Sequence, residues 1–200
     1  PGYPGSVAVV PNGVTLGPAV EAGPPVADRL LFPGAVTYHA NLDAVRYFAD
    51  SILPLVRAER PGVALRVTGR TDGVALGDLA QKVEFTGYLD TLAPLLRASW
   101  AVVVPLREGG GTRLKILEAL AAGTPVVSTS KGAEGLDLEA GHDLLVADEP
   151  ADFAAATVRL LSSPELRATL SANGRSAVER YNWAGIGPAF CSLVESLAPS

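Results

Sequence analysis

The residues best suited to chemistry lie in one stretch, which runs from Glu108 to Val127 and reads Glu-Gly-Gly-Gly-Thr-Arg-Leu-Lys-Ile-Leu-Glu-Ala-Leu-Ala-Ala-Gly-Thr-Pro-Val-Val. It predicts a glycine-rich turn, a helix and then a buried strand. Glycines before a helix let a ligand approach the free backbone N–H groups of the first turn, where the helix dipole favours an anion such as a diphosphate. Glu118, further along this helix, can accept hydrogen bonds from sugar hydroxyls, so the stretch indicates a nucleotide-sugar site.

Two cations, Arg113 and Lys115, lie in the first turn of that helix. Cations there oppose the helix dipole, and a bound anion would reverse this penalty. Solvated surface charges are the alternative, as is a Lys115–Glu118 pair, because residues three apart are neighbours on a helix. Glu118 stands in an apolar run, where a carboxylate is expensive to bury without partners. Ribose hydroxyls or a backbone turn would satisfy it.

The sequence does not match the motifs of other common nucleotide-binding or metal sites. The glycine run is neither G-x-G-x-x-G after the first strand nor G-x-x-x-x-G-K-[ST], which disfavours a nicotinamide dinucleotide site and a P-loop. Two histidines, His39 and His142, and a single cysteine, Cys191, are too few for a dedicated metal site. We expect no cofactor and no required metal, and we expect Cys191 to be buried as a small hydrophobic residue.

Alternating apolar strands and helices must position these residues. The expected strands are 30–34, 63–69, 83–87, 101–104, 125–128 and 144–146, and the expected helices are 41–57, 74–79, 91–98, 113–122, 151–161, 164–181 and 183–197. Strands that are apolar throughout and alternate with helices predict a parallel, Rossmann-like α/β sheet covered on both faces. Ligands bind beyond the carboxyl ends of such strands, where the glycine-bearing turns at Gly34, Gly69, Gly87 and Gly109–Gly111 should form one rim.

Residues 1–28 differ from the rest and are expected to be a lead-in or interdomain segment. They contain six prolines and five glycines, a density that helices do not tolerate. Within them, Ser6–Val14 predicts a short strand and a tight turn, with positive φ at Asn12 and Gly13. Residues 29–200 are expected to form the ligand-binding domain, with extra helices at the C-terminal end.

Composition narrows the class of protein. The chain has 200 residues, of which 48% are hydrophobic and 18% charged, so a large core is expected. A net charge of −5 argues against broad nucleic-acid binding, which needs a basic face. No apolar run nears the roughly 20 residues of a membrane-spanning helix. The sequence contains no methionine, and we therefore expect it to begin inside a longer gene product or after processing.

The stretch Gly110–Val127 resembles the donor-site signature of GT-B glycosyltransferases, specifically the retaining group called family 4. Other segments agree with the family in the expected order, and they are Val10–Val14, Phe32–Gly34, Asn41–Ala44, Leu53–Val56, Val67–Gly69, Phe85–Leu89, Lys131–Leu136 and Tyr181–Trp183. The resemblance covers nearly all of residues 7–190. It implies a two-domain enzyme with a cleft between Rossmann-like halves, of which this chain matches the C-terminal, donor-binding half.

The resemblance also implies which residues contact the donor. In this family the second glutamate of an E-x7-E motif binds the donor ribose, and Glu118 matches it. The remaining donor-binding positions are Gly110, Gly111, Thr112, Arg113, Lys115, Tyr88 and Leu89, the last two in the turn that lines the nucleobase pocket. Arg113 and Lys115 would neutralise the leaving diphosphate, which gains charge in the transition state. Catalytic residues are expected in the absent N-terminal domain.

The chain departs from the family pattern in two places. Gly110 stands where the first glutamate of the motif would touch the donor sugar, and Glu108 lies two positions early. The usual arginine and lysine after the first strand are also missing, because that segment reads Gly-Ala-Val-Thr-Tyr-His-Ala-Asn. Within it, we expect Asn41 to cap the helix and keep His39 as a weaker candidate for the donor site.

The expected function is transfer of a sugar, a hexose by analogy within the family, from a UDP- or GDP-sugar to an acceptor with retention. The resemblance implies a cytoplasmic bacterial enzyme of glycan biosynthesis, with peripheral contact to the inner face of the membrane in the full-length protein. Its partners would be the nucleotide sugar and its own N-terminal domain, without nucleic acid. The isolated fragment is expected to bind nucleotide weakly and to be inactive. Two alternatives are a nucleotide-sugar epimerase of the same architecture and a degenerate, non-catalytic interaction module.

Overall fold

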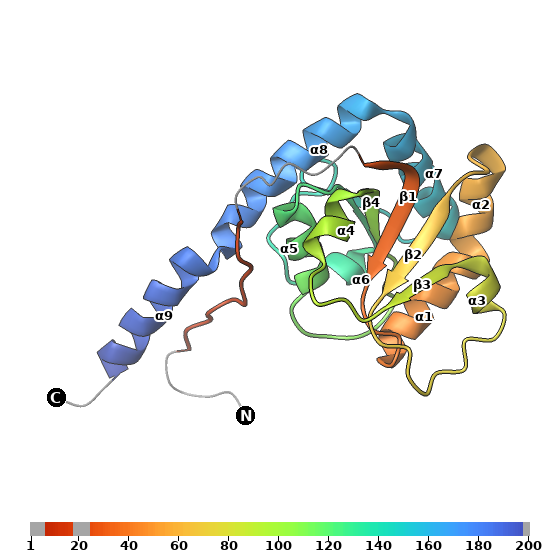
Figure 1. The fold of residues 1–200 in the computed structure, drawn as a ribbon. Helices are drawn as coiled ribbons and strands as arrows, with labels where there is room; N and C mark the ends of the chain where they lie inside the picture. Colours follow the sequence, from red (N-terminus) through yellow and green to blue (C-terminus); the bar gives the residue numbers. More distant parts are fainter. Residues whose placement is uncertain (1–6, 18–24, 198–200) are drawn as a thin grey trace.

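The computed structural model describes residues 7–17 and 25–197 and contains a six-stranded parallel sheet (Figure 1). The strands are β1 (Val26–Pro33), β2 (Ala64–Thr68), β3 (Glu84–Gly87), β4 (Ser99–Val104), β5 (Val126–Ser128) and β6 (Leu145–Val146). Their order across the sheet is β3-β2-β1-β4-β5-β6, which is the order of a doubly wound Rossmann sheet. The predicted α/β class is therefore confirmed.

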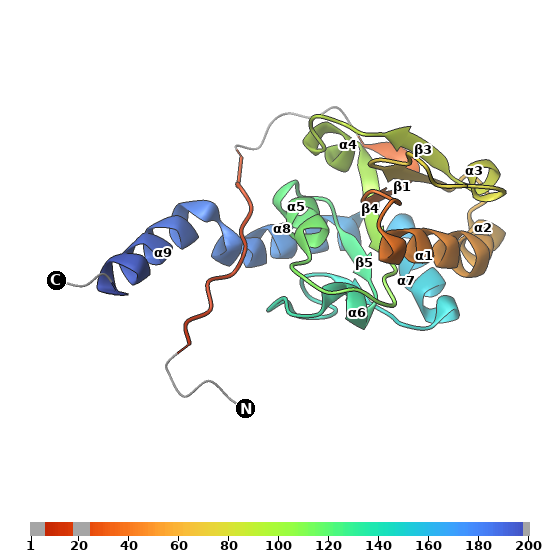
Figure 2. The same cartoon turned by 90° about the horizontal axis from the view of Figure 1, so that it is seen from below.

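Helices cover both faces of the sheet (Figure 2). They are α1 (His39–Tyr47), α2 (Leu53–Glu59), α3 (Leu79–Lys82), α4 (Ala93–Arg97), α5 (Leu114–Ala121), α6 (Ser130–Ala133), α7 (Pro150–Ser162), α8 (Pro164–Ala177) and α9 (Trp183–Leu197). Helix α7 packs beside α2 on one face, while α4 and α5 lie against the other. The central strands β1 and β4 are consequently buried on both sides, which explains their continuous apolar runs.

The predicted helix 41–57 is longer and less regular than expected. Between α1 and α2 the chain forms a π-helical turn, η1 (Phe48–Ile52). Pro54 lies directly after this turn, and proline can neither donate a backbone N–H nor fit against the preceding turn of a regular helix. The wider turn accommodates the proline while Phe48, Ile52 and Leu53 remain buried.

The loops after β1, β2 and β3 meet at one rim, as predicted. The N–H of Gly34 donates to the carbonyl oxygen of Thr68 at 3.2 Å, and the N–H of Gly69 donates to that of Gly87 at 2.8 Å. The strand order reverses between β1 and β4. The loop after β4 carries the glycine run, so this run lies at the reversal point of the sheet.

The lead-in and the last helix lie next to each other at one side of the sheet. Val14 donates its N–H to the carbonyl oxygen of Tyr181 at 2.8 Å and accepts from the N–H of Trp183 at 3.1 Å. From there α9 runs away from the body of the molecule (Figures 1 and 2). Phe190 and Val194 are about half exposed, with 51% and 50% of their surface accessible.

Four local expectations are wrong. Residues 74–79 form no helix, because Gly77 adopts a left-handed φ of +57° and α3 begins only at Leu79. The positive φ expected at Asn12 and Gly13 is not found, and the described part of 6–14 contains only an isolated bridge at Val14. Cys191 is exposed, because α9 leaves the body.

Helix α6 is a further difference, because no periodic pattern in the sequence predicted it. It has only four residues, and the hydroxyl of Thr129 caps it by accepting a hydrogen bond from the N–H of Gly132 at 2.9 Å. Within residues 7–17 and 25–197, no helix is long and apolar enough to cross a bilayer.

The contact between α8 and α5 generates a stability prediction. A Cβ built on Gly174 would lie 2.5 Å from Cδ2 of Leu120 and 3.0 Å from the carbonyl oxygen of Asp143. We predict that Gly174→Ala lowers the free energy of unfolding by about 1–3 kcal/mol, the usual cost of overpacking, as measured by chemical denaturation. Gly185→Ala on α9 is the matched control, because a Cβ there meets nothing within 4 Å. Equal stability of the two variants would contradict this packing.

Candidate functional site

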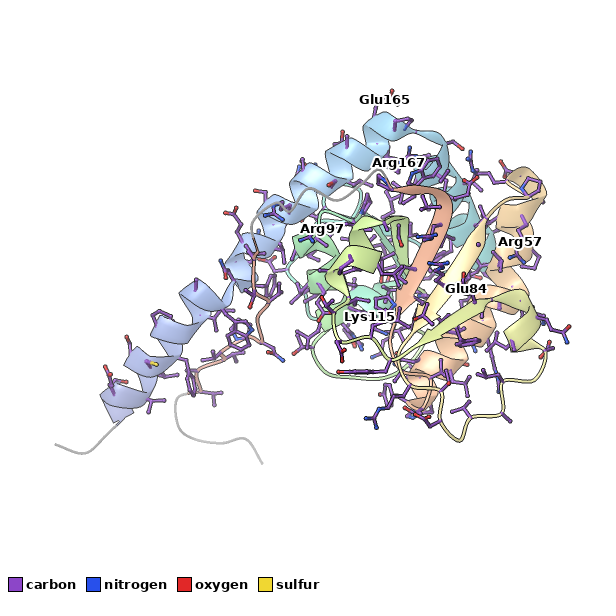
Figure 3. The ribbon with its side chains drawn as sticks, viewed as in Figure 1. Arg57, Glu84, Arg97, Lys115, Glu165 and Arg167 are labelled. Carbon is purple, nitrogen blue, oxygen red and sulfur yellow. The ribbon has the colours of Figure 1, made fainter. Side chains whose placement is uncertain are left out.

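The candidate site lies where the strand order reverses, between β1 and β4. Residues 34–38 follow β1, and residues 105–113 follow β4 and lead into α5. In open α/β sheets ligands bind in the crevice at such a point, beyond the carboxyl ends of the strands. Figure 3 places Lys115 of α5 just beyond the end of β1. The residues predicted from the glycine run therefore gather at the predicted rim.

The glycine loop (residues 108–113) presents unpaired backbone donors. Gly109 and Gly111 adopt φ values of +96° and +86°, which residues with a side chain rarely tolerate. In the part of the chain that the structure describes, no N–H group from Gly109 to Lys115 donates a hydrogen bond to the protein. Such groups at the start of a helix are the ones that a bound anion satisfies. Thr112 is exposed in the same loop.

Arg113 lies behind this loop rather than in front of it. Its side chain is only 6% exposed, and it donates to the carbonyl oxygens of Gly109 at 3.1 Å and Gly110 at 3.4 Å. It also pairs with Glu134 at 3.2 Å. Because a trans peptide is planar, a carbonyl that points toward Arg113 directs the following N–H the other way. The guanidinium thus orients the N–H groups of Gly110 and Gly111, and its predicted direct contact with a diphosphate stays a prediction.

Lys115 contacts helix α1 and strand β1, which lie opposite its own helix. Its ammonium donates to Oδ1 of Asn41 at 2.7 Å and lies 4.2 Å from the centroid of the Phe32 ring. The alternative pairing with Glu118 is not among the ion pairs of the described residues. Burial, followed by repulsion from Arg113, lowers the pKa of Lys115 to about 7, while Glu118 acts in the opposite direction.

The expectation that Asn41 caps its helix is wrong. Helix α1 begins two residues earlier, at His39, and Tyr38 occupies the N-cap. Asn41 is 9% exposed, and its Nδ2 donates to the carbonyl oxygen of Ala35 at 2.9 Å while its Oδ1 accepts from Lys115. The amide therefore joins the loop after β1 to α5. Sequence reasoning missed this role because asparagine before a helical pattern is also a common cap.

Glu118 borders a hollow of about 520 Å³ beside α5, a size typical of small-molecule sites. The walls come from α5, from the start of α4 and from the lead-in, and they include Leu114, Glu118, Asp90, Leu92, Thr15 and Trp183. The carboxylate of Glu118 forms no ion pair or hydrogen bond with the residues that the structure describes. Partial desolvation by its helix raises the pKa of the carboxyl, and Lys115 opposes this shift. The carboxylate is therefore available to ligand hydroxyls.

Tyr88 and Leu89 lie on the turn after β3, with 68% and 37% of their surface exposed. They do not line the hollow, whose wall in this region begins at Asp90. Sequence reasoning missed Thr91 and Leu92 as wall residues, and the only signal for them was their position directly after the predicted turn. Nothing in the sequence around Thr15, in the lead-in, indicated that it would line the hollow.

His39 and Glu108 meet at the outer edge of the site. Nε2 of His39 lies 3.5 Å from Oε1 of Glu108, and both side chains are largely exposed. A Cβ built on Gly110 would meet nothing within 4 Å. The position that a glutamate occupies in the family pattern is thus open space.

Comparison with known proteins gives a family match over most of the chain. Residues 27–163 match the family described as glycosyl transferases group 1. A phosphatidyl-myo-inositol mannosyltransferase from Mycobacterium leprae is 32% identical over 211 residues, which cover 98% of this chain and 55% of that relative. The chain thus spans about half the length of the curated relatives that it matches.

Solved structures share the fold at lower identity. TarM from S. aureus, crystallised as a variant with fondaparinux, α-GlcNAc-glycerol and UDP, superposes with a TM-score of 0.76 at 20% identity, over 93% of this chain and 39% of that one. HepE from Anabaena, in complex with UDP and glucose, gives a TM-score of 0.70 at 18% identity, over 86% and 49%. With the predicted fold confirmed and the family match spanning β1 to α7, the chain belongs to the group 1 glycosyl transferases.

Proposed function

We propose that this chain is the donor-binding half of a glycosyltransferase and that it binds a nucleotide diphosphate sugar at the glycine loop. One observation carries the proposal. Among residues 7–17 and 25–197, the N–H groups before α5 have no hydrogen-bond acceptor, and the carboxylate of Glu118, on the same helix, borders a hollow. Phosphate oxygens can accept hydrogen bonds from these N–H groups, and ribose hydroxyls can donate to the carboxylate of Glu118. The N–H groups and the carboxylate are separated by about one turn of the helix.

In this proposal the residues of the site have different roles in binding the donor. The loop N–H groups and Lys115 bind the diphosphate, and they stabilise the negative charge that it gains as it leaves the sugar. Arg113 keeps the loop in the orientation that binds. Because these groups supply the positive potential, we propose that donor binding needs no metal ion. Retention at the anomeric carbon follows from the family resemblance and belongs to the same proposal.

The relatives support a nucleoside diphosphate as the carrier. TarM and HepE were solved with UDP, HepE also with glucose, and the mycobacterial relative is named for mannosyl transfer. These ligands and names belong to the related proteins. For this chain, they favour a nucleotide sugar over other anions that could bind at the N-terminus of a helix.

We also propose that the acceptor and the remaining catalytic groups come from an N-terminal domain that packs on α9. The apolar side chains of Trp183, Phe190 and Val194 are 43–51% exposed on this helix. The lead-in joins the start of the same helix through Val14. A second domain connected through the lead-in would therefore begin beside the exposed apolar surface. A cytoplasmic location and peripheral membrane contact of the full-length protein remain predictions.

The first prediction concerns donor binding. Glu118→Ala should weaken binding of a nucleotide sugar by about tenfold or more, because a hydrogen bond to a charged group contributes roughly 1.5–3 kcal/mol. Calorimetric titration of the chain with UDP-, GDP- and ADP-glucose would measure this and would identify the base. EDTA should leave the affinity unchanged.

The control for this experiment is Glu59→Ala, at the exposed end of α2 and remote from the rim. It should bind like the unmodified chain. If none of the three nucleotide sugars binds, the proposed function is wrong, and the open position at Gly110 would then favour a non-catalytic interaction module.

Another prediction concerns the proposed N-terminal domain. In the full-length protein, Phe190→Asp should reduce sugar transfer by about tenfold or more, because a carboxylate buried in an apolar interface is strongly unfavourable. The same substitution should leave nucleotide binding by the isolated chain unchanged. Leu55→Asp is the matched control, since Leu55 is a similarly exposed leucine on α2. Equal effects of the two substitutions on transfer would contradict docking on α9.

A further inference from the structure

The ammonium of Lys115 occupies a confined place between three elements. It has one hydrogen-bond acceptor among the described residues, Oδ1 of Asn41 at 2.7 Å, and it lies over the Phe32 ring, 4.2 Å from its centroid. Gly34 leaves room for it, because a Cβ there would lie 3.1 Å from Nζ and 2.8 Å from Nδ2 of Asn41. The amine is thus held at the rim by a neutral amide instead of a carboxylate.

The charges that face this amine do not compensate it. From α5 it faces Arg113, which repels it, and Glu118, which attracts it without forming an ion pair. From β1 it faces the uncharged Phe32, and from α1 it faces the amide of Asn41. His39, at the start of α1, is already paired with Glu108. The protonated amine therefore lacks a full counter-charge until an anion arrives.

We propose that Lys115 takes up a proton when the diphosphate of a donor binds at the glycine loop, so that ligand and proton bind together. This inference rests on the proposed function and adds a regulatory property to the same site. The proton passes from hydronium or a buffer acid to the lone pair of the neutral Nζ: one N–H bond forms, and the bond between that proton and the donor acid breaks, which leaves water or the buffer's conjugate base. The diphosphate then supplies the negative charge next to the Lys115 ammonium that no carboxylate of the described residues provides.

The direction of the pH dependence follows from linkage. A donor that binds more tightly to the protonated form loses affinity as pH rises through the pKa of the free site, which lies at about 7. Above that value affinity should fall by up to about tenfold per pH unit, until the pKa of the bound form is reached. Below it the amine is already charged, and the uptake of protons should disappear.

Asn41 is a positioning residue in this scheme. Its Nδ2 is fixed by the carbonyl oxygen of Ala35, so its Oδ1 presents a defined acceptor to Lys115. Asn41→Asp would place a permanent counter-charge at the same point. This variant should keep Lys115 protonated above neutral pH and remove the coupling, whereas a merely structural role of Asn41 would leave the titration of Lys115 unaltered.

A first experiment follows the amine without any ligand. The chain contains only three lysines, Lys82, Lys115 and Lys131, so ¹³C-lysine labelling would resolve each Cε resonance as a function of pH. Lys82 and Lys131 both form ion pairs with carboxylates and serve as internal references. The resonance that disappears from the spectrum of Lys115→Gln is thereby assigned to Lys115. In the unmodified chain it should titrate at least two pH units below Lys82, whose hydrogen bonds to Asp50 and Asp78 raise its pKa, and it should move upward in Asn41→Asp.

A second experiment counts protons on binding. A nucleotide sugar is the probe, because its diphosphate, unlike that of a free nucleoside diphosphate, has no group that titrates near neutral pH. Calorimetric titration in two buffers of different ionisation enthalpy, near pH 8 and near pH 6, gives the number of protons bound. We expect close to one proton per donor near pH 8 and little near pH 6. Lys115→Gln should abolish the uptake, and Lys82→Gln should preserve it.

The outcomes distinguish this inference from the function on which it rests. Donor binding without proton uptake near pH 8, or unchanged uptake in Lys115→Gln, would overturn the coupling and leave the donor site intact. Titration of Lys115 together with Lys82 would overturn it as well. If no nucleotide sugar binds, the proposed donor site is wrong, and the coupling fails with it.

Discussion

The site depends on the contact between the buried guanidinium of Arg113 and two carbonyl oxygens of the glycine loop. Those hydrogen bonds hold the loop with its carbonyls inward, and peptide planarity then directs the N–H groups toward solvent. A loop of consecutive glycines has high conformational entropy in the unfolded chain. The buried arginine restricts this freedom in the folded protein, so the glycines provide close approach to a ligand without leaving the loop undefined.

The architecture and the place of the site could be predicted from the sequence, because they follow from strong local patterns. Apolar runs predict strands that are buried on both faces, and the glycines after them mark the carboxyl ends where ligands bind. The helix that contains Glu118 was clear from its apolar spacing. Boundaries were less clear where a single residue overrides the pattern, as Pro54 does by producing a π turn and as Gly77 does by its left-handed backbone.

The roles of Arg113 and Asn41 could not be predicted in the same way. Both side chains are polar residues at the start of a helix, where solvent exposure or capping is the ordinary expectation. Their partners lie far away in sequence or behind the chain: Asn41 meets Lys115 across 74 positions, and Arg113 turns back onto Gly109 and pairs with Glu134. Such contacts depend on the tertiary fold, which brings the loop after β1 against α5, and no local pattern records them.

The open space at Gly110 distinguishes this position, where a side chain would fit, from its two neighbours, where the backbone requires glycine. Its neighbours Gly109 and Gly111 are held by their left-handed backbone, whereas Gly110 has no such φ and faces no atom that a side chain would strike. Selection on folding is therefore weak at this one position and strong on both sides of it. A side chain can therefore be introduced at Gly110 without a clash, while the backbone on either side of it stays as it is.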